Sequence, residues 1–304
     1  MTSEEQGALN FSLYEALSKE QPIEKIKALI AKGADANATD GYSCTMLKVA
    51  RTVEQTKLLI EAGADVNALA PNGETALLVS LSQSTEKARV LLEAGADVTI
   101  GTNSGTVLQY ARGQEQKDLI RGALNKTLWR AVANGDVNMA NRALVSGADI
   151  SIRDKTNDRT LLHIAKGAEM VEFLVEQGEL DVNARDNLGR TPLMRMALKG
   201  QKEEVSQLLK YKEVDVNATI GKQPDYSVYR KFEKILETHQ YVNKPKGIDM
   251  KDIAVPSAWN LAFCSGHSEV ADIIVKEMDK RESWAETKRV LDGMEILKSR
   301  KLRE

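Results

Sequence analysis

The sequence has little of what most catalytic, metal-binding and membrane proteins depend on. Its 304 residues include two cysteines and three histidines, and aromatic residues make up 5% of the chain. Cys44 and Cys264 lie too far apart in sequence to suggest a metal site, and so few cysteines favour a reducing compartment. No apolar run is long enough to span a bilayer. The net charge of −2 gives no sign of binding to a polyanion such as nucleic acid.

Recognisable enzyme motifs are also missing from the sequence. The chain has no phosphate-binding P-loop, no zinc-binding H-E-x-x-H, no G-x-S-x-G and no dinucleotide-binding glycine pattern. Its first residues are acidic and lack the apolar core of a signal peptide. We therefore expect a cytoplasmic protein that is not an enzyme. We expect no cofactor, no metal, no small-molecule substrate, and no membrane or nucleic-acid partner.

What the sequence does have is one motif that recurs, with changes, along most of the chain. The most complete copy opens with a turn at residues 186–189, where Asp and Asn bond nearby backbone and Gly accepts a positive φ. Thr191 and Pro192 favour a helix start, because Thr caps free N–H groups and Pro has none to leave unbonded. A second helix with paired leucines follows. An extended arm at residues 214–217 closes the copy.

This unit resembles the ankyrin repeat, whose pattern is D-x-x-G-x-T-P-L-H-x-A, a glycine, a second helix with paired leucines, and then G-A-D-V-N. The resemblance is specific because many positions must agree at a period of about 33 residues. It implies an all-α ankyrin-repeat solenoid of about eight helix-turn-helix repeats with short β-hairpin loops, in which each repeat touches only its neighbours. In this family the turn tips and the exposed side of the first helices, here called the first-helix face, bind a partner protein.

Several copies depart from the pattern. Copies two, four and six lack residues between their two helices. Copy four also lacks its arm near Asn125, and copy five begins like the opening copy of an array. We therefore predict an N-terminal block at residues 1–124 and a C-terminal block at residues 125–281, with one continuous stack as the alternative. An insertion at residues 219–256 splits copy eight, and residues 282–304 are predicted to form a capping helix.

The insertion concentrates aromatic residues in a chain that has few. Residues 225–239 are predicted to form an amphipathic helix. Tyr226, Tyr229 and Arg230 are of the types enriched in binding hot spots, and long loops often carry function. Two roles remain open for these side chains: direct contact with a partner, and packing back onto copies seven and eight.

The family resemblance gives structural roles to several polar residues. His163 and His267 stand at positions where the ring ties neighbouring repeats through hydrogen bonds. His239, in the insertion, lies outside the repeat pattern. The asparagines of the arms are expected to bond the loop backbone: Asn37, Asn67, Asn183 and Asn217.

Candidate partner-binding residues follow from motif position, because side chains on the tips and on the first-helix face are not needed for packing. On the tips they are Tyr42, Ser43, Asn72, Glu74, Lys155, Asn157, Arg159, Asn187 and Arg190. On the first-helix face they are Asn134 and Lys199, and in the insertion they are Tyr226, Tyr229 and Arg230.

Three other functions stay open. A secreted effector of an intracellular bacterium or symbiont would use the same surface on a host protein, inside the host cell. An enzyme would need its site in the insertion, with a carboxylate or a cysteine converging on His239. Nucleic-acid binding would require one continuous positive face made by Lys155, Arg159, Arg190 and Lys199.

Overall fold

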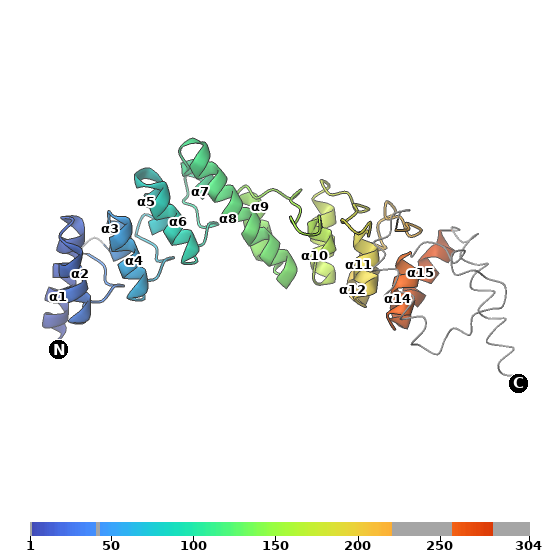
Figure 1. The fold of residues 1–304 in the computed structure, drawn as a ribbon, viewed down its shortest axis with the longest axis horizontal. Helices are drawn as coiled ribbons and strands as arrows, with labels where there is room; N and C mark the ends of the chain where they lie inside the picture. Colours follow the sequence, from blue (N-terminus) through green and yellow to red (C-terminus); the bar gives the residue numbers. More distant parts are fainter. Residues whose placement is uncertain (1, 41–42, 221–256, 282–304) are drawn as a thin grey trace, which may run out of the picture. The chain divides into compact units, whose positions relative to one another are not determined.

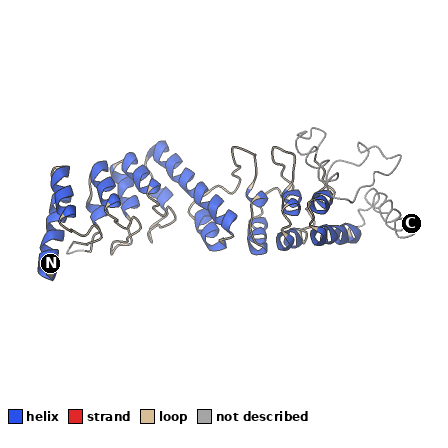
Figure 2. Cartoon of the chain, turned by 60° about the horizontal axis from the view of Figure 1, so that its bottom comes forward, coloured by secondary structure: helices blue, strands red, loops and turns tan. Residues whose placement is uncertain are grey.

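The structure is a computed structural model that describes residues 2–40, 43–220 and 257–281. These residues form helices joined by turns and loops, with three isolated antiparallel bridges and no regular β strand among them (Figure 2). The predicted hairpin loops are therefore turns with at most a single bridge. The chain divides into two compact units, unit 1 with residues 1–129 and 138–149, and unit 2 with residues 130–137 and 150–304.

Unit 1 is a succession of helix pairs (Figure 1). Its helices are α1 (Ser3–Ser18), α2 (Ile23–Ala31), α3 (Met46–Val49), α4 (Val53–Glu61), α5 (Ala76–Gln83), α6 (Thr85–Glu93), α7 (Val107–Tyr110), most of α8 (Gly113–Asn134) and most of α9 (Val137–Val145). A continuous hydrophobic core runs between them and contains Leu13, Leu47, Leu77 and Leu91, each at most 1% exposed. The core is thus supplied by a few leucines from each pair, as expected when a repeat packs only on its neighbours.

Unit 2 is also built from helix pairs. Its elements include η1 (Leu161–His163, a 3-10 helix), α10 (Ala168–Glu176), α11 (Pro192–Leu198), α12 (Lys202–Leu208), α14 (Ala258–Cys264) and α15 (Ser268–Lys280). The start of α11 has the predicted chemistry, because the Thr191 hydroxyl accepts the N–H of Met194 at 3.3 Å and Pro192 lies in the first turn. Leu174 and Val205 are fully buried in the core of this unit.

The first helices are very short in copies two, four and six, the copies that lack residues between their two helices. α3 and α7 have four residues each and η1 has three, whereas α5 has eight and α11 has seven. A helix this short leaves most of its terminal N–H and C=O groups without a helical partner. Buried polar side chains near the start of a second helix bond backbone groups at these connections: Gln55, Lys87, Gln116 and Glu204.

Two glutamines serve the short connections of copies two and four in the same way. Gln55 accepts the N–H of Arg51 at 2.8 Å and donates to a carbonyl of the preceding repeat at 3.5 Å. Gln116 accepts the N–H of Arg112 at 2.6 Å and donates to a carbonyl of the preceding repeat at 3.1 Å. Each side chain therefore replaces backbone bonds that a longer first helix would make for itself.

The arm asparagines bond the backbone of the next arm, as expected. Asn37 donates to the carbonyl of Gly63 at 2.9 Å and accepts the N–H of Asp65 at 2.7 Å. Asn67 makes the same two bonds at 3.4 Å and 2.7 Å, and Asn183 makes them at 2.7 Å and 2.8 Å. The prediction is confirmed for these three residues.

Two long helices provide an asparagine where an arm is missing. α8 has 22 residues and runs through Asn125 without a break, so copy four has no arm, as predicted. Asn125 accepts the N–H of Asp149 at 2.8 Å, and Asn10 of α1 accepts the N–H of Asp35 at 2.9 Å. Copy five thus bonds its arm as copy one does, which agrees with its interpretation as an opening copy. The blocks at residues 1–124 and 125–281 stay a prediction.

Candidate protein-binding surface

The tip of copy six is a loop at residues 153–159 that is organised by one carboxylate. Asp154 accepts the backbone N–H groups of Thr156 and Asn157, and its side chain pairs with Arg159. These bonds from Asn157, Arg159 and Thr156 outweigh burial and lower the pKa of Asp154, so the carboxylate stays charged. Lys155 is exposed and makes no ion pair with any described residue. The loop is therefore fixed in its backbone and leaves one cation toward solvent.

The tip of copy seven is held by a buried ion pair. Asp186 accepts the N–H groups of Leu188 and Arg190, each at 2.9 Å. The Arg190 guanidinium donates to the same carboxylate at 2.9 Å and 2.8 Å, and the Asp186 side chain is 0% exposed. The expectation that Arg190 is not needed for packing is therefore wrong. Its guanidinium is used inside the repeat because Asp186 would otherwise be a buried charge without a partner.

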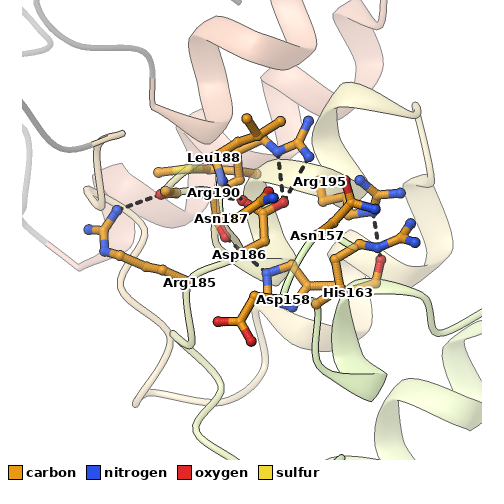
Figure 3. Close-up of polar contacts among 12 residues, drawn as sticks. Asn157, Asp158, His163, Arg185, Asp186, Asn187, Leu188, Arg190 and Arg195 are labelled. Atoms are coloured by element: carbon orange, nitrogen blue, oxygen red, sulfur yellow. Dashed lines mark hydrogen bonds and ion pairs between the residues drawn. The ribbon is translucent and has the colours of Figure 1, made fainter. Parts of the chain in front are cut away.

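The two tips are bonded to each other (Figure 3). Asn187 donates its backbone N–H to the carbonyl of Asn157 at 2.8 Å and its amide to the carbonyl of Thr156 at 3.0 Å. Arg153 donates to the carbonyl of Arg185 at 3.0 Å. Two of the sequence-predicted candidates, Asn157 and Asn187, are thus brought together. The loops form one surface whose backbone is fixed before any partner arrives.

His163 and His267 lie at contacts between repeats. His163 Nε2 is 2.9 Å from the carbonyl oxygen of Arg190, and its Nδ1 is 2.8 Å from the Thr160 hydroxyl. Burial lowers the pKa of His163, so the ring is neutral, with the proton on Nε2 because a carbonyl oxygen only accepts. The ring of His267 leaves no space for a side chain at Gly200, where an added Cβ would be 2.5 Å from Nδ1. The bond from His163 to Arg190 joins neighbouring repeats, as predicted. The His267 ring lies against Gly200 of copy seven, and its hydrogen bonds between repeats stay a prediction.

The first-helix face of unit 2 carries cations that sequence analysis partly missed. Asn134 and Lys199 are exposed at the ends of α8 and α11. Arg195, on α11, donates to the carbonyl of His163 at 3.0 Å. Burial and then the charges of Arg159 and Arg190 lower the pKa of Arg195, and burial and then Arg195 and Arg159 lower that of Lys199. These cations are therefore close enough to repel one another.

The insertion enters and leaves the fold at a tip. Thr219 and Ser257 form an isolated antiparallel bridge, as Thr39 and Thr45 do at the tip of copy two. Arg185 donates to the carbonyl of Thr219 at 2.7 Å and to that of Gly189 at 2.7 Å. The N-terminal end of the insertion is thus bonded to the tip of copy seven through Arg185.

The candidates of unit 1 lie on separate tips. Ser43 is exposed in a turn with a φ of 59°. Asn72 and Glu74 are brought together, because Lys48 bonds Asn72 at 3.3 Å and pairs with Glu74 at 2.8 Å. The bond from Lys48 lowers the pKa of Glu74. Here too a tip is tied to a neighbouring first helix.

Several predicted residues lie outside the described part of the chain: Tyr42, Tyr226, Tyr229, Arg230, His239 and the helix at residues 282–304. Sequence analysis also missed Arg153, Arg185 and Arg195 as members of the surface. Arg195 could have been found from its motif position. It directly follows the residue at the H position of T-P-L-H, and the side chain at this following position is only partly buried. Of the four residues considered for a continuous positive face, Arg159 and Arg190 are paired with carboxylates.

No described helix is both long and apolar enough to cross a bilayer. Within residues 2–40, 43–220 and 257–281, no three His, Cys, Asp or Glu side chains gather in a way that could hold a metal ion.

Successive pairs of helices joined by turns, with bonds between neighbouring arms and between the tips of copies six and seven, define a helical repeat protein. The family model for ankyrin repeats matches residues 13–122 and 128–220, and the chain belongs to the ankyrin-repeat family. The prediction of an all-α ankyrin fold is confirmed, whereas the match does not establish the number of repeats. Ankyrin repeats generally mediate binding between proteins.

One curated relative is similar over a short stretch. It is the protein "Putative glutaminase 2" of Caenorhabditis elegans, 44% identical over 62 residues, or 19% of this chain. The match covers 10% of that relative. The chain therefore spans about a tenth of the length of the curated relative, and the activity in that name is a statement about the relative alone.

Proposed function

We propose that this chain is a protein-interaction module or scaffold, an array of about eight repeats that binds a partner protein. Its binding surface would comprise the tips, the first-helix face and the insertion at residues 219–256. The observation that carries the proposal is the bonded pair of tips in unit 2, where Asn187 bonds both Thr156 and Asn157. We place the protein in the cytoplasm and assign it no catalytic role.

A surface of this kind binds at low entropic cost. The backbone groups of both tips are already bonded within the fold, and the charges of Asp154 and Asp186 are already paired. Association then orders side chains such as Lys155 and Lys199 rather than whole loops, which reduces the free-energy cost of binding. Shape and a few anchor side chains would set the choice of partner.

Site-specific photo-crosslinking tests the proposal. The photoreactive residue p-benzoylphenylalanine would replace, one at a time, Lys155 on a tip, Asn134 on the first-helix face and Glu203 on the second helix α12, all exposed. We expect one discrete partner protein to be captured from positions 155 and 134 and not from position 203. Equal capture from all three positions, or from position 203 alone, would contradict the proposed surface.

A second variant separates the insertion from the rest of the surface. Residues 220–255 would be replaced by a short turn that joins Thr219 to Pro256, and folding would be checked by circular dichroism. Loss of the crosslink at position 155 would make the insertion part of the recognition element. Its retention would leave the tips and the first-helix face as the binding surface.

The two alternatives from sequence predict other results. A host-directed effector would crosslink to a protein of host cells rather than to one of its own cytoplasm. An enzyme centred on the insertion would turn over a substrate, and replacing His239 would abolish that activity.

A further inference from the structure

The first-helix face of unit 2 has a one-sided charge. In each copy this face consists of the residue after the H position of the T-P-L-H motif. It also includes the residues directly before the glycine that follows the first helix. In copies five to seven the members that are not buried are Arg130, Ala133, Asn134, Ile164, Lys166, Arg195, Leu198 and Lys199. Four of them are cations and none is a carboxylate.

The same positions in unit 1 are balanced. Lys19 pairs with Glu15 one helical turn away, and Arg51 lies 3.7 Å from Glu20. The residue after the H position is apolar or aromatic in copies two to four: Val49, Val79 and Tyr110. Of the described cations on this face of unit 1, only Arg112 lacks an ion pair. The charge of unit 2 is therefore not a general consequence of building this fold.

Nearby carboxylates act on the cations of this face without pairing with them: Asp186 and Asp154 attract Arg195, and Glu204 attracts Lys199. No described residue forms an ion pair with Arg130, Lys166, Arg195 or Lys199, whereas the neighbouring Arg159 and Arg190 are each paired with an aspartate. Arg195 is held in place by its bond to the carbonyl of His163, 3.0 Å away. A half-buried, oriented guanidinium without a carboxylate is a good receptor for one, because its fork of N–H groups matches the two carboxylate oxygens.

We propose that this face binds an acidic, extended segment of the partner protein, with Arg195 and Lys199 at the centre of the contact. The inference rests on the proposed function and adds the chemistry of the partner. Ile164 and Leu198 belong to the same face and are half-buried, so the segment would combine carboxylates with small apolar residues. Such complementarity speeds association and selects against basic partners.

The observations favour a peptide over a nucleic acid. Single-stranded nucleic acids bind surfaces that combine cations with aromatic side chains on which bases stack. None of the eight exposed or half-buried members of this face is aromatic.

The test measures binding of a fluorescein-labelled peptide that alternates glutamate with alanine and leucine, by fluorescence anisotropy on the full chain. A second peptide has glutamine in place of each glutamate. The site variant is Arg195→Gln/Lys199→Gln. The matched control is Lys57→Gln/Lys117→Gln, which removes two exposed cations from α4 and α8 of unit 1. Lys199→Glu is a third variant, because the Lys199 side chain is exposed and forms no ion pair with any described residue.

We expect the glutamate peptide to bind the wild type, and the control variant equally well. Binding to the site variant should be about tenfold weaker, and raised salt should weaken it in the wild type. Lys199→Glu should weaken peptide binding at least as much, and its circular dichroism spectrum should be the same as that of the wild type. The inference is overturned if the wild type does not bind, if the glutamine peptide binds equally, or if both double variants behave alike.

Two further results separate this inference from the function on which it rests. If Arg195→Gln/Lys199→Gln still captures the crosslinked partner at wild-type yield, the proposed protein binding stands. The inference that this face binds an acidic segment of the partner is then wrong. If single-stranded RNA binds more tightly than the peptide and loses its affinity in the same variant, the face is a nucleic-acid site and the inference fails.

Discussion

Lys87 of unit 1 and Glu204 of unit 2 occupy the same position and carry opposite charges. Each is the third residue of a second helix, and they are 0% and 7% exposed. Lys87 donates to the carbonyl of Ala50, the residue that follows α3, and to Gln83 at 2.9 Å. Glu204 accepts the N–H of Gly167, the residue that precedes α10, at 2.8 Å.

The difference shows what decides the charge at this position. A shortened repeat leaves either the C-terminal carbonyls of its first helix or the N-terminal N–H groups of its second helix unbonded. A cation can donate hydrogen bonds to the free carbonyls, and an anion can accept them from the free N–H groups. The partial charges at the two helix ends favour the same choice. In other copies the same position is uncharged, as with Gln55, Met170 and Val270. The buried charge therefore records how the neighbouring repeat is shortened.

The strongest test of this comparison is to reverse the two charges. Lys87→Glu would turn a carboxylate toward a carbonyl, and Glu204→Lys would turn an ammonium toward an N–H. We expect each to lower the stability of its own unit by about 3–5 kcal/mol, the usual effect of a buried charge without a partner. Hydrogen–deuterium exchange would report opening of each unit separately, which matters because repeat arrays need not unfold in one step.

The controls for charge reversal keep size but not charge. Glu204→Gln retains an acceptor for Gly167, and Lys87→Met removes a buried charge together with its two hydrogen bonds, so both should be nearly neutral. If the reversed variants are no less stable than these controls, the sign of the charge does not matter and the comparison fails.

A second prediction compares the ion pairs at the tips. Asp186 and Arg190 are 0% and 10% exposed, whereas Lys48 and Glu74 are 17% and 35% exposed. Arg190→Ala should cost about 3 kcal/mol in unit 2, because Asp186 stays buried and loses its partner. Lys48→Ala should cost less than about 1 kcal/mol in unit 1. Urea unfolding monitored by circular dichroism measures both, and similar losses would show that burial is not what separates the two pairs.

The third prediction concerns pH. Burial lowers the pKa of Lys87 from 10.5 to about 8. Between these values the unfolded chain binds more protons than the folded chain, so stability rises with pH; below pH 8 the cost of the buried charge is fully present. We expect wild type to gain about 2 kcal/mol relative to Lys87→Met between pH 8 and pH 10. Parallel stability curves for the two proteins would contradict this assignment.

Much of the fold could be predicted because its signals are local. Thr191 and Pro192 mark a helix start, and the absence of residues between helices predicts the short α3, α7 and η1. The structural role of His163 and of three arm asparagines followed from motif position. The partners of Lys87 and Glu204 could not be predicted, because each bonds a backbone group of another repeat, 37 residues away in sequence for both.

The candidate surface was harder to predict, because tip positions look alike in sequence. Asp186 was seen as a turn residue, but its burial, and hence its need for Arg190, depends on the neighbouring repeats. Arg195 was missed although its position was visible, because motif reading alone does not show which cations lack a counter-charge. The roles of Tyr226, Tyr229 and Arg230 stay predictions.

The smallest expected effect belongs to the arm asparagines, which occur in both units. Asn183 makes two bonds of normal length, at 2.7 Å and 2.8 Å, whereas one of the two bonds of Asn67 is stretched to 3.4 Å. Since a hydrogen bond contributes about 1 kcal/mol and weakens with distance, Asn183→Ala should cost about 1–2 kcal/mol and Asn67→Ala about 1 kcal/mol. Exchange rates of the following arm amides, Asp215 and Asp97, would measure the difference.

The aspartate variants sharpen this last comparison. Asn183→Asp keeps the acceptor for the N–H of Asp215 and turns an oxygen toward the carbonyl of Glu213, so it should cost at least as much as Asn183→Ala. Asn67→Asp should cost less than Asn183→Asp, because the carbonyl of Gly95 is already 3.4 Å from the Asn67 amide. If the two aspartate variants lose equal stability, the donated bond contributes little in either unit, and the accepted N–H alone joins one arm to the next.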